Sequence, residues 1–437
     1  MDIRHLIDTT RMSTYQWFII GLASFLNALD GYDLVAMAFT SSAVSEEFAL
    51  TGAPLGWLLS AALIGIGLGS LFLAPLADRY GRKTLILAAL AIDLLGLTMS
   101  ALADSFTELL LWRVVTGIGV GGILACVTVV VSEFSNLRFR GLAISIYSAG
   151  YGLGASLCGV LAAQFTPAYG WRSIFAIGAA LTAASLVLTA FALPESVDYL
   201  RGRGEHAKVR EVARRIGKTG EVEVREAGVD KQSASITELF RGPLRATTIR
   251  LWIAFSLITA GFQFANQWTP KLLTEYGLSA QQGIIGGIML SFGGTIGSLL
   301  FGSLTTRIDA RRVLTAFTLL SAVVLVGFVS AAAWPTLMFA LGVGVGMLLN
   351  GCVTGMYTVT PQAYPAALRT TGVGSAIGIA RGGAVLAPIV VGYLHDAGWS
   401  PTALYSAAAV LVGVTALVLV GVREYTAPVV EREGVRV

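Results

Sequence analysis

The sequence contains twelve separate runs of about 20 mostly apolar residues, and this feature restricts the fold more than any other. A run of this length can cross the hydrocarbon core of a bilayer as an α-helix. Inside lipid, only helices and closed barrels satisfy their own backbone hydrogen bonds. Because 13% of the residues are charged, against about 25% in soluble domains, we predict an all-α integral membrane protein with twelve transmembrane helices. The predicted spans are roughly 17–40, 54–76, 84–104, 107–131, 141–163, 171–193, 250–270, 283–304, 313–333, 336–359, 371–394 and 401–421.

The basic residues gather on one side of these spans. If the N-terminus is cytoplasmic, the cytoplasmic segments hold all of the 30 Lys and Arg residues except Arg113, Arg172, Lys271 and Arg381. This asymmetry is the positive-inside pattern of membrane proteins. We therefore predict a multi-pass protein of the inner (plasma) membrane with both termini in the cytoplasm. The net charge of +4 then belongs to loops that face anionic lipid, and nucleic-acid binding is not implied.

The apolar pattern stops in the middle of the chain and divides it into two parts of six spans each. We predict an N-terminal six-helix bundle over 1–193, a cytoplasmic linker over 194–249 with a short helix near 208–216, and a C-terminal six-helix bundle with a cytoplasmic tail over 250–437. The linker is charged, has few aromatic residues and carries no binding motif. The Arg-rich turns APLADRYGRK (74–83) and GSLTTRIDARR (302–312) follow the second and eighth spans. Parallel six-helix repeats are typical of transporters whose halves rock around a central site, although two Arg-rich inner loops can also resemble each other by chance.

Two aspartates lie in the first span, in the stretch FLNALDGYDLVAMAF (25–39). A carboxylate at the centre of a membrane helix costs about 2.5–3.5 kcal/mol on insertion scales. Asp30 and Asp33 are three residues apart and therefore share a helix face. Two such carboxylates in a low dielectric cannot both ionise cheaply, so we expect them to titrate as a coupled pair and to bind the proton in a proton-coupled process. The alternative is that they only pair with an interior arginine.

Two arginines lie inside predicted spans. Arg113 and Asp33 lie at similar depths below the outer ends of their spans, because each residue adds 1.5 Å along a helix, so we expect them to form an ion pair. Arg381 lies near the midpoint of the eleventh span and needs an anion. The sequence offers Asp93, the pair of Asp30 and Asp33, or a substrate carboxylate, which matches the planar guanidinium fork. Substrate contact and an internal ion pair both remain open for Arg381.

Several other interior residues can orient a polar ligand, or can only hold helices together. The seventh span contains FQFANQW, which places three amides at helical spacing. With Arg381, the candidate substrate-binding residues are Tyr32, Tyr147, Tyr151, Gln263, Asn266, Gln267, Asn350 and Tyr357.

Four motifs resemble known families. DRYGRK after the second span, RVVTGIGVGG in the fourth and PESVDYL at the end of the sixth resemble the major facilitator superfamily over essentially the whole chain. The stretch DGYD (30–33) is similar to the first-span motif of the aromatic acid:proton symporter family. The resemblance implies the major facilitator fold, and it implies that Asp30, Asp33 and Arg113 take part in proton movement. Ala74 departs from the family loop, which usually begins with glycine.

The resemblance also implies a gate at the cytoplasmic ends of the helices. Ion pairs between the second–third loop and the fourth–fifth loop would hold the inner face closed when the outer face is open, although the charges could also reflect topology alone. The candidate gating residues are Asp78, Arg79, Gly81, Arg82, Lys83, Glu133 and Arg140.

We therefore expect a proton-coupled symporter that imports a small aromatic carboxylate, such as a benzoate or hydroxybenzoate, by alternating access. The expected partners are this substrate, protons and the lipid bilayer, and the expected state is a monomer. The alternatives are a superfamily transporter for a sugar or another organic acid, or an exporter. An enzyme is not expected, because no nucleophile–base pair, metal cluster or phosphate loop is present in the sequence. No cofactor and no metal are expected.

Overall fold

The computed structural model describes residues 3–217, 236–241, 244–331, 334–365 and 368–422, without the side chains of residues 3, 4, 78 and 370. The side chain of the candidate gating residue Asp78 therefore lies outside the described part of the chain.

Twelve helices in the described part of the chain are long and apolar enough to cross a membrane, as the hydropathy pattern predicts. They are α2 (Thr14–Glu47), α3 (Gly52–Phe72), α5 (Arg82–Ala101), α6 (Phe106–Phe134), α7 (Arg140–Tyr169), α8 (Arg172–Ala192), α11 (Leu244–Glu275), α12 (Ala280–Leu304), α13 (Ala310–Ser330), α14 (Pro335–Val359), α15 (Arg369–Asp396) and α16 (Pro401–Val420).

Several spans are longer than the apolar runs, because polar residues at their ends continue the helix. Helix α2 begins at Thr14 because Ser13 and Gln16 form a capping box, in which each side chain bonds the other residue's backbone N–H. Helix α11 begins at Leu244, six residues before the predicted start of the seventh span.

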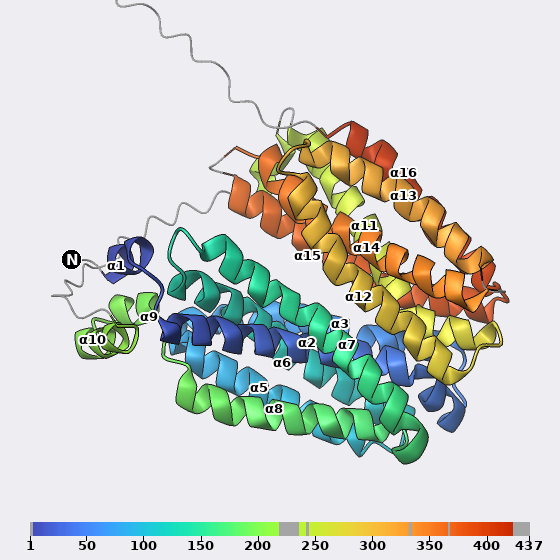
Figure 1. Cartoon of the computed structure of the whole chain (residues 1–437), viewed down its shortest axis with the longest axis horizontal. Helices are drawn as coiled ribbons and strands as arrows, with labels where there is room; N and C mark the ends of the chain where they lie inside the picture. Colours follow the sequence, from blue (N-terminus) through green and yellow to red (C-terminus); the bar gives the residue numbers. More distant parts are fainter. Residues whose placement is uncertain (1–2, 218–235, 242–243, 332–333, 366–367, 423–437) are drawn as a thin grey trace, which may run out of the picture.

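Short helices occupy the regions between spans. They are α1 (Ile3–Thr9), α4 (Leu76–Tyr80), α9 (Val197–Gly202), α10 (His206–Arg215) and the 3₁₀ turns η1 (Ile236–Phe240) and η2 (Thr360–Ala363). Helix α10 corresponds to the short helix predicted near 208–216. Its apolar residues Val209, Val212 and Ala213 are buried in one cluster with Ile7 of α1, so α1, α9 and α10 pack together at one end of the molecule (Figure 1).

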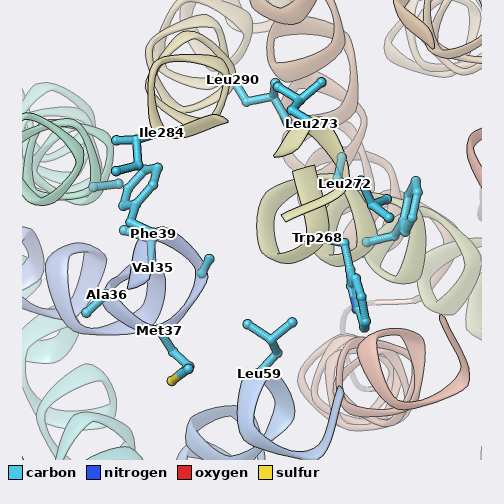
Figure 2. Packing of buried hydrophobic residues seen from close by; sticks show 14 of the residues in the cluster. Val35, Ala36, Met37, Phe39, Leu59, Trp268, Leu272, Leu273, Ile284 and Leu290 are labelled. Atoms are coloured by element: carbon cyan, nitrogen blue, oxygen red, sulfur yellow. The ribbon is translucent and has the colours of Figure 1, made fainter. Parts of the chain in front are cut away.

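Figure 1 shows α2–α8 grouped below and α11–α16 grouped above, and we call these the first and second bundles. The bundles meet mainly through α2 with α11, α3 with α15 and α7 with α12, and α2 also touches α12. One apolar cluster crosses between the bundles: Phe39 of α2 and Leu59 of α3 belong to it together with Trp268 of α11 and Ile284 of α12 (Figure 2).

We call the end that carries α1, α9 and α10 the connector end, and the opposite end, where α3 begins and α15 ends, the loop end (Figure 1). At the loop end, the hydroxyls of Ser42 on α2 and Thr274 on α11 are 3.4 Å apart. Ser60 of α3 donates to the carbonyl of Val385 at 2.8 Å, closer to mid-depth. These contacts join the two bundles over the half of the molecule that ends at the loop end.

Candidate functional site

Helix α2 reaches the interior because glycines let it contact α7 backbone to backbone. A Cβ on Gly31 would lie 2.1 Å from the carbonyl oxygen of Tyr151, and one on Gly154 would lie 1.7 Å from that of Ala28. No larger residue fits at either distance. This close approach buries both aspartates of α2, since Asp30 is 3% exposed and Asp33 is 2% exposed.

Asp33 forms the ion pair with Arg113 that their matched depths predict. The Nη1 atom of Arg113 lies 2.5 Å from Asp33 Oδ1, and Nη2 donates to the backbone carbonyl of Asp33 at 2.8 Å. The guanidinium also lies over the ring of Phe175, 5.4 Å from its centroid. Arg113 is fully buried, so this carboxylate and this guanidinium balance each other in the interior of the first bundle.

Asp30 lies on the same face of α2, but no cation within the described residues is at ion-pair distance from it. Its Oδ2 atom is buried and has no hydrogen-bond partner there. Tyr147 and Tyr151 of α7 both lie close enough to interact with Asp30 electrostatically. The two aspartates of the DGYD stretch thus have different surroundings: Asp33 has a fixed counter-ion and Asp30 does not.

Helix α11 adds unsatisfied amides opposite α2 and α7. Four buried atoms have no hydrogen-bond partner among the described residues: Oε1 of Gln263, Nδ2 of Asn266, Oε1 of Gln267 and the hydroxyl of Tyr151. Asn266 lies within hydrogen-bonding reach of the Tyr151 hydroxyl, so these two groups can partly satisfy each other. The Nε2 atom of Gln267 contacts the carbonyl of Leu34 at 3.4 Å. Buried polar groups are ordinarily hydrogen-bonded, so this set has spare capacity for a polar ligand.

Arg381 contributes a cation from α15. It is partly buried, and its Nη1 atom lies 3.4 Å from the carbonyl of Ile66 on α3. In the part of the chain that the structure describes, none of Asp30, Asp33 and Asp93 forms an ion pair with it. Tyr357 of α14 is 51% exposed and interacts electrostatically with Arg381.

Three other candidate residues are engaged within their own bundles. The hydroxyl of Tyr32 donates to the carbonyl of Ile174 on α8 at 2.7 Å, and the hydroxyl of Tyr147 accepts from Thr128 at 3.2 Å. The Nδ2 atom of Asn350 donates to the carbonyl of Gly294 at 2.7 Å. Each of these bonds holds two helices together, and a role in substrate binding stays a prediction for all three residues.

A polar cluster at the connector end joins α5, α6 and the segment before α9. Arg82 Nη1 lies 2.7 Å from Glu133 Oε1, and Arg82 also donates to the hydroxyl of Ser196. Ser196 in turn donates to Glu133 Oε2 at 2.6 Å. The three side chains thus form a closed triangle within the first bundle.

Next to this cluster, Glu195 contacts the backbone of the turn over 76–83. Its Oε1 atom accepts from the backbone N–H of Lys83 at 3.0 Å, and a Cβ on Gly81 would lie 2.5 Å from its Oε2. Gly81 has φ +97°, which L residues with a side chain rarely adopt. The carbonyl of Arg79 accepts from Arg203 at 2.7 Å.

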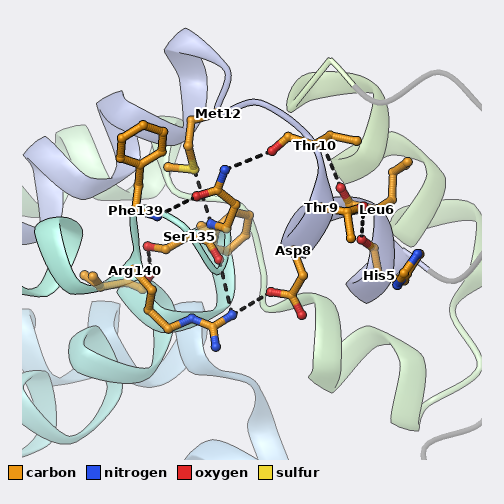
Figure 3. A network of polar contacts seen from close by, with 12 residues as sticks. His5, Leu6, Asp8, Thr9, Thr10, Met12, Ser135, Phe139 and Arg140 are labelled. Atoms are coloured by element: carbon orange, nitrogen blue, oxygen red, sulfur yellow. Dashed lines mark hydrogen bonds and ion pairs between the residues drawn. The ribbon is translucent and has the colours of Figure 1, made fainter.

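Arg140 binds elsewhere. Its Nη2 atom lies 2.6 Å from Asp8 Oδ1 (Figure 3). The backbone N–H of Leu137 donates to the carbonyl of Asp8. Asn136 also donates to the carbonyl of Thr10 at 2.9 Å. Within the described part of the chain, the carboxylate partner of Arg140 comes from α1, so this residue docks the N-terminal helix onto the turn between α6 and α7.

Several residues outside the candidates from the sequence make polar contacts at the two ends of the molecule. Glu195 and Ser196 come from the PESVDYL stretch, which the sequence marks only by family resemblance. Asp396 joins the bundles at the loop end: its Oδ1 accepts from the backbone N–H of Gly52 at 2.6 Å, and its Oδ2 accepts from Ala53 at 2.8 Å. No local pattern in the sequence indicates that contact.

Comparison with known proteins fixes the family. The family model described as the Major Facilitator Superfamily matches residues 20–299 and 281–436. The chain belongs to the major facilitator superfamily. It is therefore a multi-pass membrane transporter with twelve spans among its described residues, and it is not an enzyme.

Superfamily members with similar sequences include transporters of aromatic acids. The chain is 31% identical to the 4-hydroxybenzoate transporter of Pseudomonas aeruginosa over 94% of this chain and 96% of that protein. It is 25% identical to the benzoate transport protein of Acinetobacter baylyi over 90% of this chain and 86% of that protein. The crystal structure of a D-xylose-proton symporter covers 93% of this chain and 97% of its own, with a TM-score of 0.73 at 16% identity. This likeness confirms the major facilitator fold.

Proposed function

We propose that this superfamily member is a proton-coupled symporter that imports a small aromatic carboxylate of the benzoate or hydroxybenzoate type. The observation that carries the proposal is Arg381, a guanidinium at mid-depth of α15 with no carboxylate partner among the described residues. The full-length similarity to a 4-hydroxybenzoate transporter and a benzoate transport protein supports the same substrate class.

The surroundings of Arg381 suit a ligand with an anionic end and a flat body. The guanidinium fork can bind a carboxylate at two points. Tyr357 offers a partly exposed ring beside it, which packs edge-on against Phe255 with ring centroids 5.2 Å apart. The amide groups of Gln263, Asn266 and Gln267 each have one buried atom without a strict hydrogen bond among the described residues, and these atoms can bind ring substituents such as a hydroxyl.

Proton coupling follows from the charge of this substrate. An anion that enters a cell with a negative-inside potential moves uphill by about 2.3 kcal/mol per charge for each 100 mV. A proton carried in the same cycle removes this cost. Asp30 is the candidate proton carrier, since it is buried and no described cation forms an ion pair with it. The Asp33–Arg113 pair lies one helical turn away.

The proposed cycle is alternating access with both termini in the cytoplasm. The positive-inside pattern assigns the connector end to the cytoplasm and the loop end to the outside. The contacts of Asp396, Ser42 and Ser60 across the bundles then belong to the state in which the outside is closed. We propose that the Arg82–Glu133–Ser196 cluster, together with Asp78, forms part of the inner gate when the bundles rock the other way.

The alternatives are a transporter for another organic acid or for a sugar, and an exporter. Purified protein in proteoliposomes separates them. The panel contains labelled benzoate, 4-hydroxybenzoate, benzamide and xylose, each tested with and without an imposed inward proton gradient. We expect gradient-driven accumulation of the two acids and none of benzamide or xylose. Accumulation of xylose alone, or of no acid under either gradient direction, would overturn the proposal, and accumulation only with the gradient reversed would indicate export.

A further inference from the structure

Asp93 of α5 is a third buried acid in the first bundle, 3% exposed. From its sequence position alone it is a possible partner for Arg381. In the structure its Oδ2 atom instead accepts a hydrogen bond from the hydroxyl of Thr182 on α8 at 3.2 Å. Its Oδ1 atom is buried with no hydrogen-bond partner among the described residues. If Asp93 were ionised, its two carboxylate oxygens would have a single hydrogen bond between them among the described residues.

The backbone of α6 holds Asp93 in this position. A Cβ on Gly119 would lie 2.7 Å from the backbone nitrogen of Asp93 and 2.8 Å from its Cβ. Helices α5 and α6 therefore touch at this point, and no room is left for a longer side chain between them. The carboxylate is fixed in the interior by packing, and no cation among the described residues lies at ion-pair distance from it.

The charges around Asp93 do not balance. Its ionisable neighbours are Asp30 and Asp33 from α2 and Arg113 from α6. Helix α8 has no ionisable side chain after Arg172 at its loop end, and Tyr147 of α7 lies nearer to Asp30. In the described part of the first bundle, three carboxyl groups therefore share one guanidinium, whose two hydrogen bonds go to the carboxylate and the backbone carbonyl of Asp33.

A buried carboxylate without a counter-ion is strongly disfavoured, and such a group takes up a proton instead. The unpartnered oxygens of Asp30 and Asp93 are each more than nine-tenths buried. We propose that Asp93 is a second proton-binding residue, which together with Asp30 carries the transported proton, while Asp33 serves as the fixed counter-ion of Arg113. This inference rests on the proposed proton symport.

The proton balance of the step is simple. A proton from the outside forms the O–H bond of a carboxylic acid at Asp30 or Asp93, which removes one buried negative charge. Release of that proton to the cytoplasm regenerates the carboxylate. The Asp33–Arg113 pair keeps its charges throughout, so it can hold α2 and α6 together in both states.

The test uses the full chain in proteoliposomes and separates coupled from uncoupled transport. For Asp93→Asn we expect 4-hydroxybenzoate exchange at zero proton gradient to persist, because exchange needs no net proton movement. We expect gradient-driven accumulation to fall at least about tenfold, the equivalent of 1.4 kcal/mol. Asp104→Asn, which removes an exposed acid at the loop end, is the matched control and should accumulate as the parent does. Parent-like accumulation by Asp93→Asn would overturn the proposal.

Two further measurements keep the test decisive. Thr182→Val removes the hydrogen bond to Asp93 but leaves the carboxyl group of Asp93 in place. Because the lost donor favoured the ionised form of that group, we expect the pH profile of accumulation to move to higher pH. An unchanged profile would contradict a proton at Asp93. Infrared spectra of purified protein at neutral pH should show a protonated-carboxyl band that Asp93→Asn loses. If the parent transports no aromatic acid, the proposed function fails, and this band still decides whether Asp93 holds a proton.

Discussion

Asp30 and Asp33 share a face of α2, yet packing gives them different chemistry. Asp33 is paired with a guanidinium that is buried with it, whereas Asp30 has no cation among the described residues. Removing one partner of a buried ion pair typically costs about 3–5 kcal/mol, so the Asp33–Arg113 pair constrains the first bundle. Asp30 has no such constraint and is the better placed of the two to gain and lose a proton.

For single residues, the prediction concerns Arg381 as the group that binds the substrate carboxylate. Lysine keeps the charge but loses the planar two-point contact with a carboxylate. We predict that Arg381→Lys weakens binding of 4-hydroxybenzoate by about tenfold, or 1.4 kcal/mol, with a much smaller effect on 4-hydroxybenzamide. Isothermal titration calorimetry on purified protein measures both. Equal losses for acid and amide would assign Arg381 to helix packing.

At the scale of helices, α3 depends on the other bundle for its N-terminal cap. Thr51 occupies the N-cap position but makes no capping bond to its own helix. Its hydroxyl donates to Asp396 Oδ2 at 3.0 Å. The carboxylate of Asp396, in place of the Thr51 side chain, accepts hydrogen bonds from the backbone N–H groups of Gly52 and Ala53 at the start of α3. The first N–H groups of a helix have no partner inside the helix, so α3 loses these bonds whenever the loop end opens.

We therefore predict that Asp396→Asn makes the loop end open more readily. Asparagine keeps only one acceptor oxygen, so one of the two bonds to the N–H groups of Gly52 and Ala53 is lost. A lost hydrogen bond costs about 1 kcal/mol, which corresponds to a change of about fivefold in an equilibrium constant. A cysteine introduced at the buried Ser60, in a chain without the three native cysteines, reports opening through its rate of alkylation in detergent. We expect that rate to rise by about this factor in Asp396→Asn.

Asp104→Asn is the control for this measurement, since Asp104 lies at the same end but pairs with Arg172 inside the first bundle at 3.4 Å. Alkylation at the same rate in Asp396→Asn and in the parent would show that the cap does not hold the bundles together.

At the scale of the whole molecule, the described parts of the two bundles contact each other through a few polar groups and mainly through one large apolar cluster. Phe39 and Leu59 from the first bundle and Trp268 and Ile284 from the second lie in that cluster (Figure 2). An apolar contact is not directional, so it can separate and re-form without a unique geometry. The division of the chain into two transport halves around the 194–249 linker remains a prediction.

A covalent bond across the loop end tests whether transport needs the bundles to separate there. The side-chain oxygens of Ser42 and Thr274 are 3.4 Å apart, so Ser42→Cys combined with Thr274→Cys should form a disulfide on oxidation. We predict that the oxidised double variant loses 4-hydroxybenzoate accumulation and that a reductant restores it. Each single variant should be insensitive to oxidation, because the native cysteines are buried. Full transport by the cross-linked protein would exclude opening at this end.

The sequence alone determined the twelve spans, because insertion into lipid depends on the mean apolar character of a window of about 20 residues. It also predicted the pairing of Asp33 with Arg113, because depth along a helix can be counted from the span end. The candidate gating residues Arg82 and Glu133 likewise meet, since each lies at the connector end of its helix.

Only the tertiary structure decided which faces of the helices meet. Asp93 is bonded to Thr182 and not to Arg381, because the packing of α5 between α6 and α8 turns its carboxylate into the first bundle. Asp396 caps α3, although more than 340 residues separate them. Hydropathy sets the depth of a residue in the membrane, but the rotation of each helix about its axis is set by close packing, as at Gly31 against Tyr151.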